Sequence, residues 1–198
     1  MNPKPRGTIP SVILCNPRYA HNVGGAFRAC SCYDIDQLWW TGDRVRLDNR
    51  PGQRLPREER MKGYKSVSFF PNEDIRKILE EFPNAVPVAV EVRPNSELLP
   101  FFEHPENAVY IFGPEDGSVA PGLLPYCHRF LAVPTAHCLN LSAAVATVLY
   151  DRRMKRMLAG LEPGWRLDDF LNESRGYFDL GSEQGSGVEG LTGVETGS

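Results

Sequence analysis

The sequence lacks the features of membrane, secreted and nucleotide-binding proteins. No hydrophobic run in its 198 residues approaches the length that spans a bilayer, and residues 1–6 contain no apolar segment typical of a signal peptide. The five cysteines have no repeated spacing, which favours reduced thiols over a disulfide framework. Neither a GxGxxG pattern nor a P-loop is present, which disfavours enzymes of dinucleotides or nucleoside triphosphates. We therefore expect a soluble protein of the cytoplasm.

Net positive charge is also missing, since the formal net charge is -3 at pH 7. Any contact with nucleic acid must therefore come from a local patch. One segment, residues 43–65, carries eight basic residues against four acidic ones. This basic segment is compatible with a solvated surface loop, or with an arm whose arginines contact phosphates.

Short apolar runs alternate along the chain with segments of helical periodicity. Strands are predicted at residues 9–15, 35–40, 66–70, 86–92, 108–112 and 130–133, and helices at residues 22–32, 72–82 and 140–158. The alternation predicts one α/β domain over residues 1–160, with a mostly parallel sheet. Residues 161–180 form a C-terminal extension, and the Gly- and Ser-rich residues 181–198 have the composition of a disordered tail.

Three segments combine small and polar residues at positions where α/β proteins bind ligands. They contain Asn22, Gly24 and Arg28; then Gly113, Glu115 and Gly117, closed by Val133-Pro134; and lastly Cys138-Leu139-Asn140-Leu141-Ser142. In this order they resemble the three signature motifs of the SpoU/TrmH-type RNA 2'-O-methyltransferases of the SPOUT superfamily. The resemblance extends over residues 9–158.

The resemblance implies a fold with helices on both faces of the sheet and a deep C-terminal trefoil knot. It also implies S-adenosylmethionine as cofactor, a homodimer that completes the RNA site, and methylation of a ribose 2'-hydroxyl, in tRNA rather than rRNA. The third motif departs from the family because Cys138 stands where serine is usual. A non-catalytic RNA-binding or assembly protein that retains the fold is therefore the alternative function. The basic segment disfavours a third possibility, an enzyme of small molecules.

The same resemblance assigns roles to the motif residues, and the basic segment adds Arg44, Arg46 and Arg54 as candidates for RNA binding. The catalytic set is Arg28, Asn22, Glu115 and Asn140. The cofactor-binding set is Gly113, Pro114, Glu115, Gly117, Val133, Pro134, Cys138, Leu141 and Ser142, and the RNA-binding set is Arg28, Arg44, Arg46 and Arg54. No metal is expected, because the Cys and His spacings match no standard site.

Each polar motif residue also has a structural role open to it. Arg28 fits a fixed cation beside the reacting oxygen, since a guanidinium keeps its proton, or an ordinary salt bridge. Asn22 stands where it can cap a helix, orient a ligand, or do both. Glu115 can accept backbone N–H groups or contact a ligand, and Asn140 can cap the last helix or bond across the knot. The glycines of the second motif allow a positive φ or a close approach of ligand to backbone.

Overall fold

The computed structural model describes residues 9–45, 67–70 and 74–162. Residues 46–65 of the basic segment, which include Arg46 and Arg54, lie outside the described residues, as do residues 163–198. The expectations for the extension and the tail therefore stay predictions.

Seven strands form one sheet in the order β3-β2-β1-β6-β4-β7-β5, and each pair of neighbours is parallel. The strands are β1 (Ser11–Leu14), β2 (Gln37–Trp40), β3 (Ser68–Phe70), β4 (Val86–Val90), β5 (Glu97–Leu98), β6 (Ala108–Phe112) and β7 (Arg129–Ala132). Every residue of β1, β2 and β6 is buried, as continuous apolar runs in a doubly covered parallel sheet should be. The predicted mostly parallel α/β fold is confirmed.

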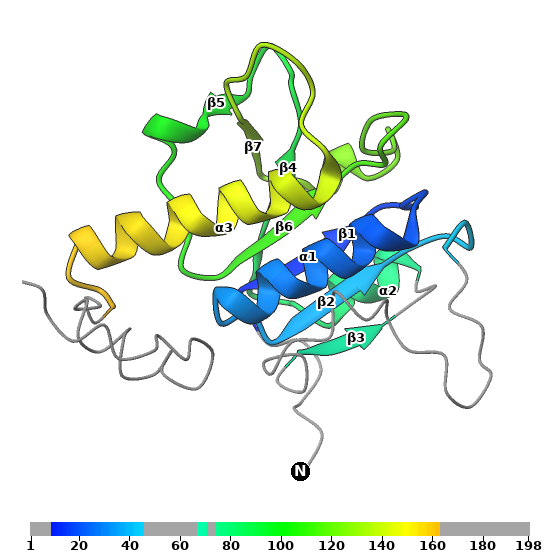
Figure 1. Ribbon diagram of the computed structural model, residues 1–198, viewed down its shortest axis with the longest axis horizontal. Coiled ribbons are helices and arrows are strands. Elements are labelled where there is room, and N and C mark those ends of the chain that lie inside the picture. Colours follow the sequence, from blue (N-terminus) through cyan, green and yellow to red (C-terminus); the bar gives the residue numbers. More distant parts are fainter. Residues whose placement is uncertain (1–8, 46–66, 71–73, 163–198) are drawn as a thin grey trace, which may run out of the picture.

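Helices cover both faces of this sheet (Figure 1). They are α1 (Ala20–Cys32), α2 (Ile75–Glu80) and α3 (Leu141–Leu158), with 3-10 turns η3 (Leu99–Phe101) and η4 (Leu124–Tyr126). None of the helices within the described ranges is long and apolar enough to cross a bilayer. The helix predicted over residues 72–82 begins later, because the Asp74 side chain accepts a hydrogen bond from the Arg76 N–H at 2.8 Å and caps α2.

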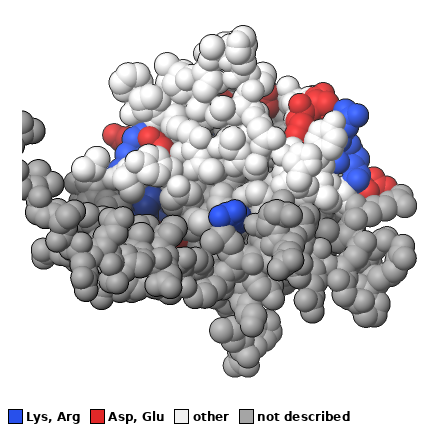
Figure 2. All heavy atoms as spheres, in the orientation of Figure 1, with Lys and Arg blue, Asp and Glu red and all other residues white. Residues whose placement is uncertain are grey.

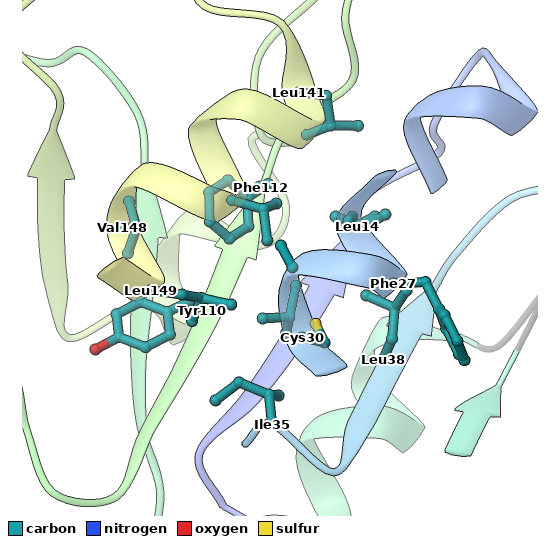
Figure 3. Close-up of a cluster of buried hydrophobic side chains, with 14 of the residues drawn as sticks. Leu14, Phe27, Cys30, Ile35, Leu38, Tyr110, Phe112, Leu141, Val148 and Leu149 are labelled. Carbon is teal, nitrogen blue, oxygen red and sulfur yellow. The ribbon is translucent and has the colours of Figure 1, made fainter. Parts of the chain in front are cut away.

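Alternate strand residues divide the core between the two faces. Val12 and Leu14 of β1 pack with α1 and α3, whereas Ile13 packs with Ile78 of α2 on the other side. In Figure 3 Phe27 and Cys30 of α1 and Leu141, Val148 and Leu149 of α3 lie together over Leu14, Leu38, Tyr110 and Phe112 of the strands. Trp39 and Trp40 of β2 are both buried in the core, so their rings pack inside the protein and are not exposed for stacking on RNA bases.

Buried polar contacts fix the carboxyl half of α3. Arg152, 5% exposed, donates hydrogen bonds to the carbonyl oxygens of residues 105–106 at 2.7 and 3.0 Å. Burial lowers the pKa of His104 to about 4, so its ring is neutral at pH 7. Since a carboxylate only accepts, His104 Nε2 donates to Asp151 at 2.8 Å and Nδ1 accepts from Tyr110 at 2.6 Å. These contacts hold α3 along the sheet.

The amino-terminal ends of α1 and α3 meet closely at Gly25 and Ser142. A Cβ atom added at Gly25 would lie 2.7 Å from Ser142 Cβ and 2.8 Å from its Oγ. Glycine is therefore required here so that the two helices can approach each other.

Gly25→Ala is expected to destabilise the protein by about 1–3 kcal/mol, even after the gain in helix propensity, because the added methyl forces the helices apart. Urea unfolding measures the loss. A second change, Ser142→Gly, removes the atoms that the methyl meets and should recover most of that loss. Gly122→Ala is the control, since a Cβ there meets nothing within 4 Å. A Gly25→Ala protein as stable as the parent would contradict this packing.

Candidate functional site

A cavity of about 200 Å³ lies where the carboxyl ends of β4, β6 and β7 meet the start of α3. The parallel register brings Val90, Phe112 and Leu131 to the same edge of the sheet, so the segments that follow these strands gather there. Residues 112–117, 131–135 and 138–144 supply most of the lining. The second and third motifs, far apart in the sequence, thus form one pocket.

Most of the predicted cofactor-binding residues line this cavity: Gly113, Pro114, Glu115, Gly117, Val133, Cys138 and Leu141. Pro134 and Ser142 are not among its lining residues. Ser142 instead packs against Gly25 and donates from Oγ to Asn140 Oδ1 at 2.7 Å. Its contribution is to the start of α3 rather than to the wall of the pocket.

A chain of side-chain hydrogen bonds joins the three motifs. Asn22 of α1 donates from Nδ2 to Glu115 Oε1 at 2.6 Å. Its Oδ1 accepts from Asn140 Nδ2 at 2.8 Å. Asn22 is 2% exposed, so these bonds satisfy a buried amide that would otherwise be costly. The amide of Asn22 therefore links α1 to the segments after β6 and before α3.

The capping role expected of Asn22 is wrong. Helix α1 begins at Ala20 with Tyr19 as the N-cap residue, which makes no side-chain capping bond. Asn22 lies inside the helix, and its side chain turns to partners on other segments instead of back to its own backbone. Asn140, by contrast, caps the last helix as predicted, and it also bonds to Asn22 of α1. Its Oδ1 accepts from the backbone N–H groups of Ser142 and Ala143 and caps α3 while Nδ2 binds Asn22.

Glu115 holds the chain that leads into α1. Its carboxylate accepts from the backbone N–H groups of Arg18 at 2.7 Å and Tyr19 at 3.3 Å, besides the Asn22 amide. The predicted role in accepting backbone N–H groups is confirmed. Burial acts to raise the pKa of Glu115, but the hydrogen bonds from Asn22, Arg18 and Tyr19 outweigh it and lower that pKa below the ordinary value. Glu115 is therefore ionised at neutral pH.

Of the two reasons predicted for glycine at position 113, the positive φ is wrong. The glycines with positive φ in the described chain are Gly42 and Gly160, so neither Gly113 nor Gly117 adopts that conformation. A Cβ at Gly113 would instead lie 2.8 Å from the backbone nitrogen of Val119. The absence of a side chain lets the segment after β6 fold back on itself beside the cavity.

The two described cations of the predicted set, Arg28 and Arg44, are not among the residues that line the cavity. The Arg28 side chain is exposed on α1. Arg44 makes a bidentate contact with Asp116 at 2.9 and 2.7 Å, and Arg18 adds a third contact at 3.3 Å. The hydrogen bonds from Arg44 hold the pKa of Asp116 below its usual value. Arg44 thus anchors the start of the basic segment to the second motif.

Sequence reasoning missed several residues of the pocket. Glu91 and Val92 follow β4 and line the cavity, although no motif marks them. Thr135, Leu139 and Ala144 also line it and lie among the motif residues. Glu91 lies near the carboxyl end of the strand predicted over residues 86–92, and this position was the available signal. In the described residues no group of three or more His, Cys, Asp or Glu side chains is placed to hold a metal ion.

Comparison with known proteins shows the family to which the chain belongs. The sequence profile of the SpoU rRNA Methylase family matches residues 10–150. The chain belongs to this family. The predicted resemblance to SpoU/TrmH-type methyltransferases is confirmed, and the matched residues contain all three motifs and the whole described sheet.

Among SpoU relatives, a tRNA (cytidine-2'-O-)-methyltransferase, TrmJ of Methanocaldococcus jannaschii, is 27% identical over 160 residues, which cover 74% of this chain and 68% of the relative. The structure of the A. aeolicus TrmH/SpoU tRNA modifying enzyme superposes with a TM-score of 0.64 at 17% identity, covering 86% and 88% of the two chains. The SpoU methyltransferase AviRb from Streptomyces viridochromogenes, in complex with AdoMet, gives 0.61 at 14% identity, covering 75% and 60%. These structures share the fold of this chain.

Glu115→Gln is expected to lower the free energy of unfolding by about 1–3 kcal/mol at pH 7, because an amide NH₂ would face N–H donors. Since the native pKa of Glu115 is lowered, its carboxylate stabilises the fold fully above the ordinary pKa, and this contribution is lost as pH falls through the native pKa. Urea unfolding at pH 7 and pH 3 should therefore show a gap between parent and variant that narrows in acid. Glu103→Gln, an exposed change, is the control; an equal gap at both pH values would contradict the assignment.

Proposed function

We propose that this protein is an S-adenosylmethionine-dependent methyltransferase that modifies a ribose 2'-hydroxyl in tRNA. The main support for the proposal is that hydrogen bonds between Asn22, Glu115 and Asn140 join the three motifs at the edge of one cavity. Membership of the SpoU family supports methyl transfer to RNA. The tRNA enzymes among the relatives support tRNA over rRNA, and the AdoMet complex of AviRb supports the cofactor.

The cavity suits this cofactor chemically. Apolar side chains of Val90, Leu131, Val133 and Leu141 would enclose its adenine ring, and the backbone around Gly113 would offer hydrogen bonds to its polar groups. When bound, S-adenosylmethionine supplies an electrophilic methyl group on a positively charged sulfur. The chain itself contributes a rigid pocket at the end of a parallel sheet, which holds the cofactor in one orientation.

Arg28 is the proposed catalytic cation. The attacking 2'-oxygen gains negative charge on the way to the transition state, so a fixed positive charge beside it stabilises the transition state more than the ground state. A guanidinium does not give up a proton at neutral pH, and the proton of the hydroxyl would pass to water or to a phosphate oxygen. Asn22, which precedes Arg28 on α1, fixes this helix against Glu115 and Asn140.

Arg28→Lys is expected to reduce the rate of methyl transfer about a hundredfold, because an ammonium lacks the planar fork of the guanidinium. Arg28 does not line the cavity, so the dissociation constant for S-adenosylmethionine, measured by calorimetry, should stay unchanged. Arg76→Lys, an exposed change on α2 at the other face of the sheet, is the matched control. Near-parental turnover by Arg28→Lys would rule out this role.

The RNA would be held by basic residues next to the cofactor pocket. Arg28 and Arg44 are the described members of the proposed set, with Arg46 and Arg54 in the part of the basic segment outside the described residues. Arg44 is held in place by Asp116 of the second motif, so phosphate contacts made there would bring the RNA backbone to the pocket.

We also propose that the protein is a cytoplasmic homodimer and that its C-terminal segments form the trefoil knot that the family resemblance implies. Figure 2 shows one face on which charged residues gather at the edges and most of the central described surface is uncharged. Leu139, Tyr150 and Leu158, in or next to α3, are exposed apolar residues suited to contact with a second copy. Sedimentation should give twice the mass of the chain.

Incubation with total tRNA, total rRNA and labelled S-adenosylmethionine tests the function directly. We expect label at one class of 2'-hydroxyl in tRNA, mapped by its resistance to alkaline cleavage. Saturable binding of RNA without cofactor binding or transfer would favour the alternative, an RNA-binding protein in which Cys138 has weakened the pocket. Exclusive labelling of rRNA would contradict the choice of tRNA.

A further inference from the structure

Charge is distributed unevenly around the proposed cofactor cavity. Among the described residues that line it, the charged side chains are Glu91 and Glu115, and no lysine or arginine is among them. The amino-terminal end of α3, whose first residues also line the cavity, contributes a partial positive charge that these carboxylates must offset. A cavity of this kind favours a ligand that carries positive charge.

The two carboxylates differ in how far their oxygens are engaged. Both oxygens of Glu115 accept hydrogen bonds from the protein. Glu91 Oε2 accepts from the backbone N–H of Val119 at 2.8 Å, and this bond fixes the carboxylate close to Gly113. Glu91 is therefore a positioned negative charge in the cavity with capacity left for a ligand.

We propose that Glu91 makes this pocket select the positively charged sulfonium of S-adenosylmethionine over the neutral thioether of the demethylated product. The inference rests on the proposed function. S-adenosylhomocysteine shares the adenosine and amino-acid groups of S-adenosylmethionine but lacks the positive charge on sulfur. A fixed carboxylate therefore attracts the sulfonium of S-adenosylmethionine and has little effect on the neutral thioether of S-adenosylhomocysteine. Loss of that attraction after transfer favours exchange of product for fresh cofactor.

The same physics limits what Glu91 does for the chemical step. The sulfonium charge diminishes on the way to the transition state, so a carboxylate near it stabilises the ground state at least as much. Glu91 is thus a specificity-determining residue for ligand binding, and Arg28 remains the proposed catalytic group.

Calorimetric titration with S-adenosylmethionine and with S-adenosylhomocysteine tests the proposal. Glu91→Gln retains an amide oxygen that can accept from Val119 N–H but removes the charge. We expect it to weaken binding of S-adenosylmethionine about tenfold while binding of S-adenosylhomocysteine changes less than about threefold. Glu80→Gln, which changes the net charge equally at the end of α2, is the control and should alter neither constant.

The outcomes separate the two proposals. If the parent protein binds no S-adenosylmethionine, the proposed function fails. If the parent binds it and Glu91→Gln weakens both ligands equally or neither, the function stands and the role of Glu91 is overturned. Should thermal unfolding show that Glu91→Gln does not fold, Glu91→Asp decides, because it keeps the charge. Glu91→Asp should then preserve the parental ratio of the dissociation constant for S-adenosylhomocysteine to that for S-adenosylmethionine. A fall of about tenfold in this ratio would refute the proposal.

Discussion

The amide of Asn22 is the contact on which the site depends, because it joins three segments that no backbone hydrogen bond joins. An amide has one donating and one accepting end, and here both are used inside the protein. Glu115 can only accept, so the orientation of the Asn22 amide is fixed, and Asn140 must then donate. Neither a carboxylate nor an alkyl group in this position can serve both neighbours. The choice of asparagine follows from the two partners.

The parallel sheet explains why such a contact can exist. Parallel strands bring their carboxyl ends to one edge, and the segments that follow β4, β6 and β7 therefore share a cavity. Strand ends alone would leave these segments free to move relative to one another. The close approach of α1 and α3 at Gly25, together with the buried Arg152 on α3, holds the helices that carry Asn22 and the cap residue Asn140. Packing thus determines the polar geometry.

Patterns within the sequence predict the elements well and the contacts between them poorly. The described strands and helices lie where apolar periodicity placed them, except β5 (Glu97–Leu98), whose two residues are too few to show a period. Capping rules misplaced Asn22, because tertiary partners outcompeted its own helix end. The need for glycine at Gly25 and the place of Glu91 in the cavity both depend on segments distant in the sequence. No local pattern encodes such information.

Negative and positive side chains of the site lie in different places, as expected if the site binds both S-adenosylmethionine and RNA. The described cavity lining has carboxylates and no cation, which suits a cofactor with net positive charge. The two described cations proposed to contact RNA lie outside that lining: Arg28 is exposed on α1, and Arg44 is held by Asp116. Under the proposed function, a polyanion that contacts these arginines would be repelled from the pocket by the carboxylates within it. A net charge of -3 is therefore compatible with an RNA substrate, because the described arginines proposed to contact RNA are separate from the carboxylates that line the cavity.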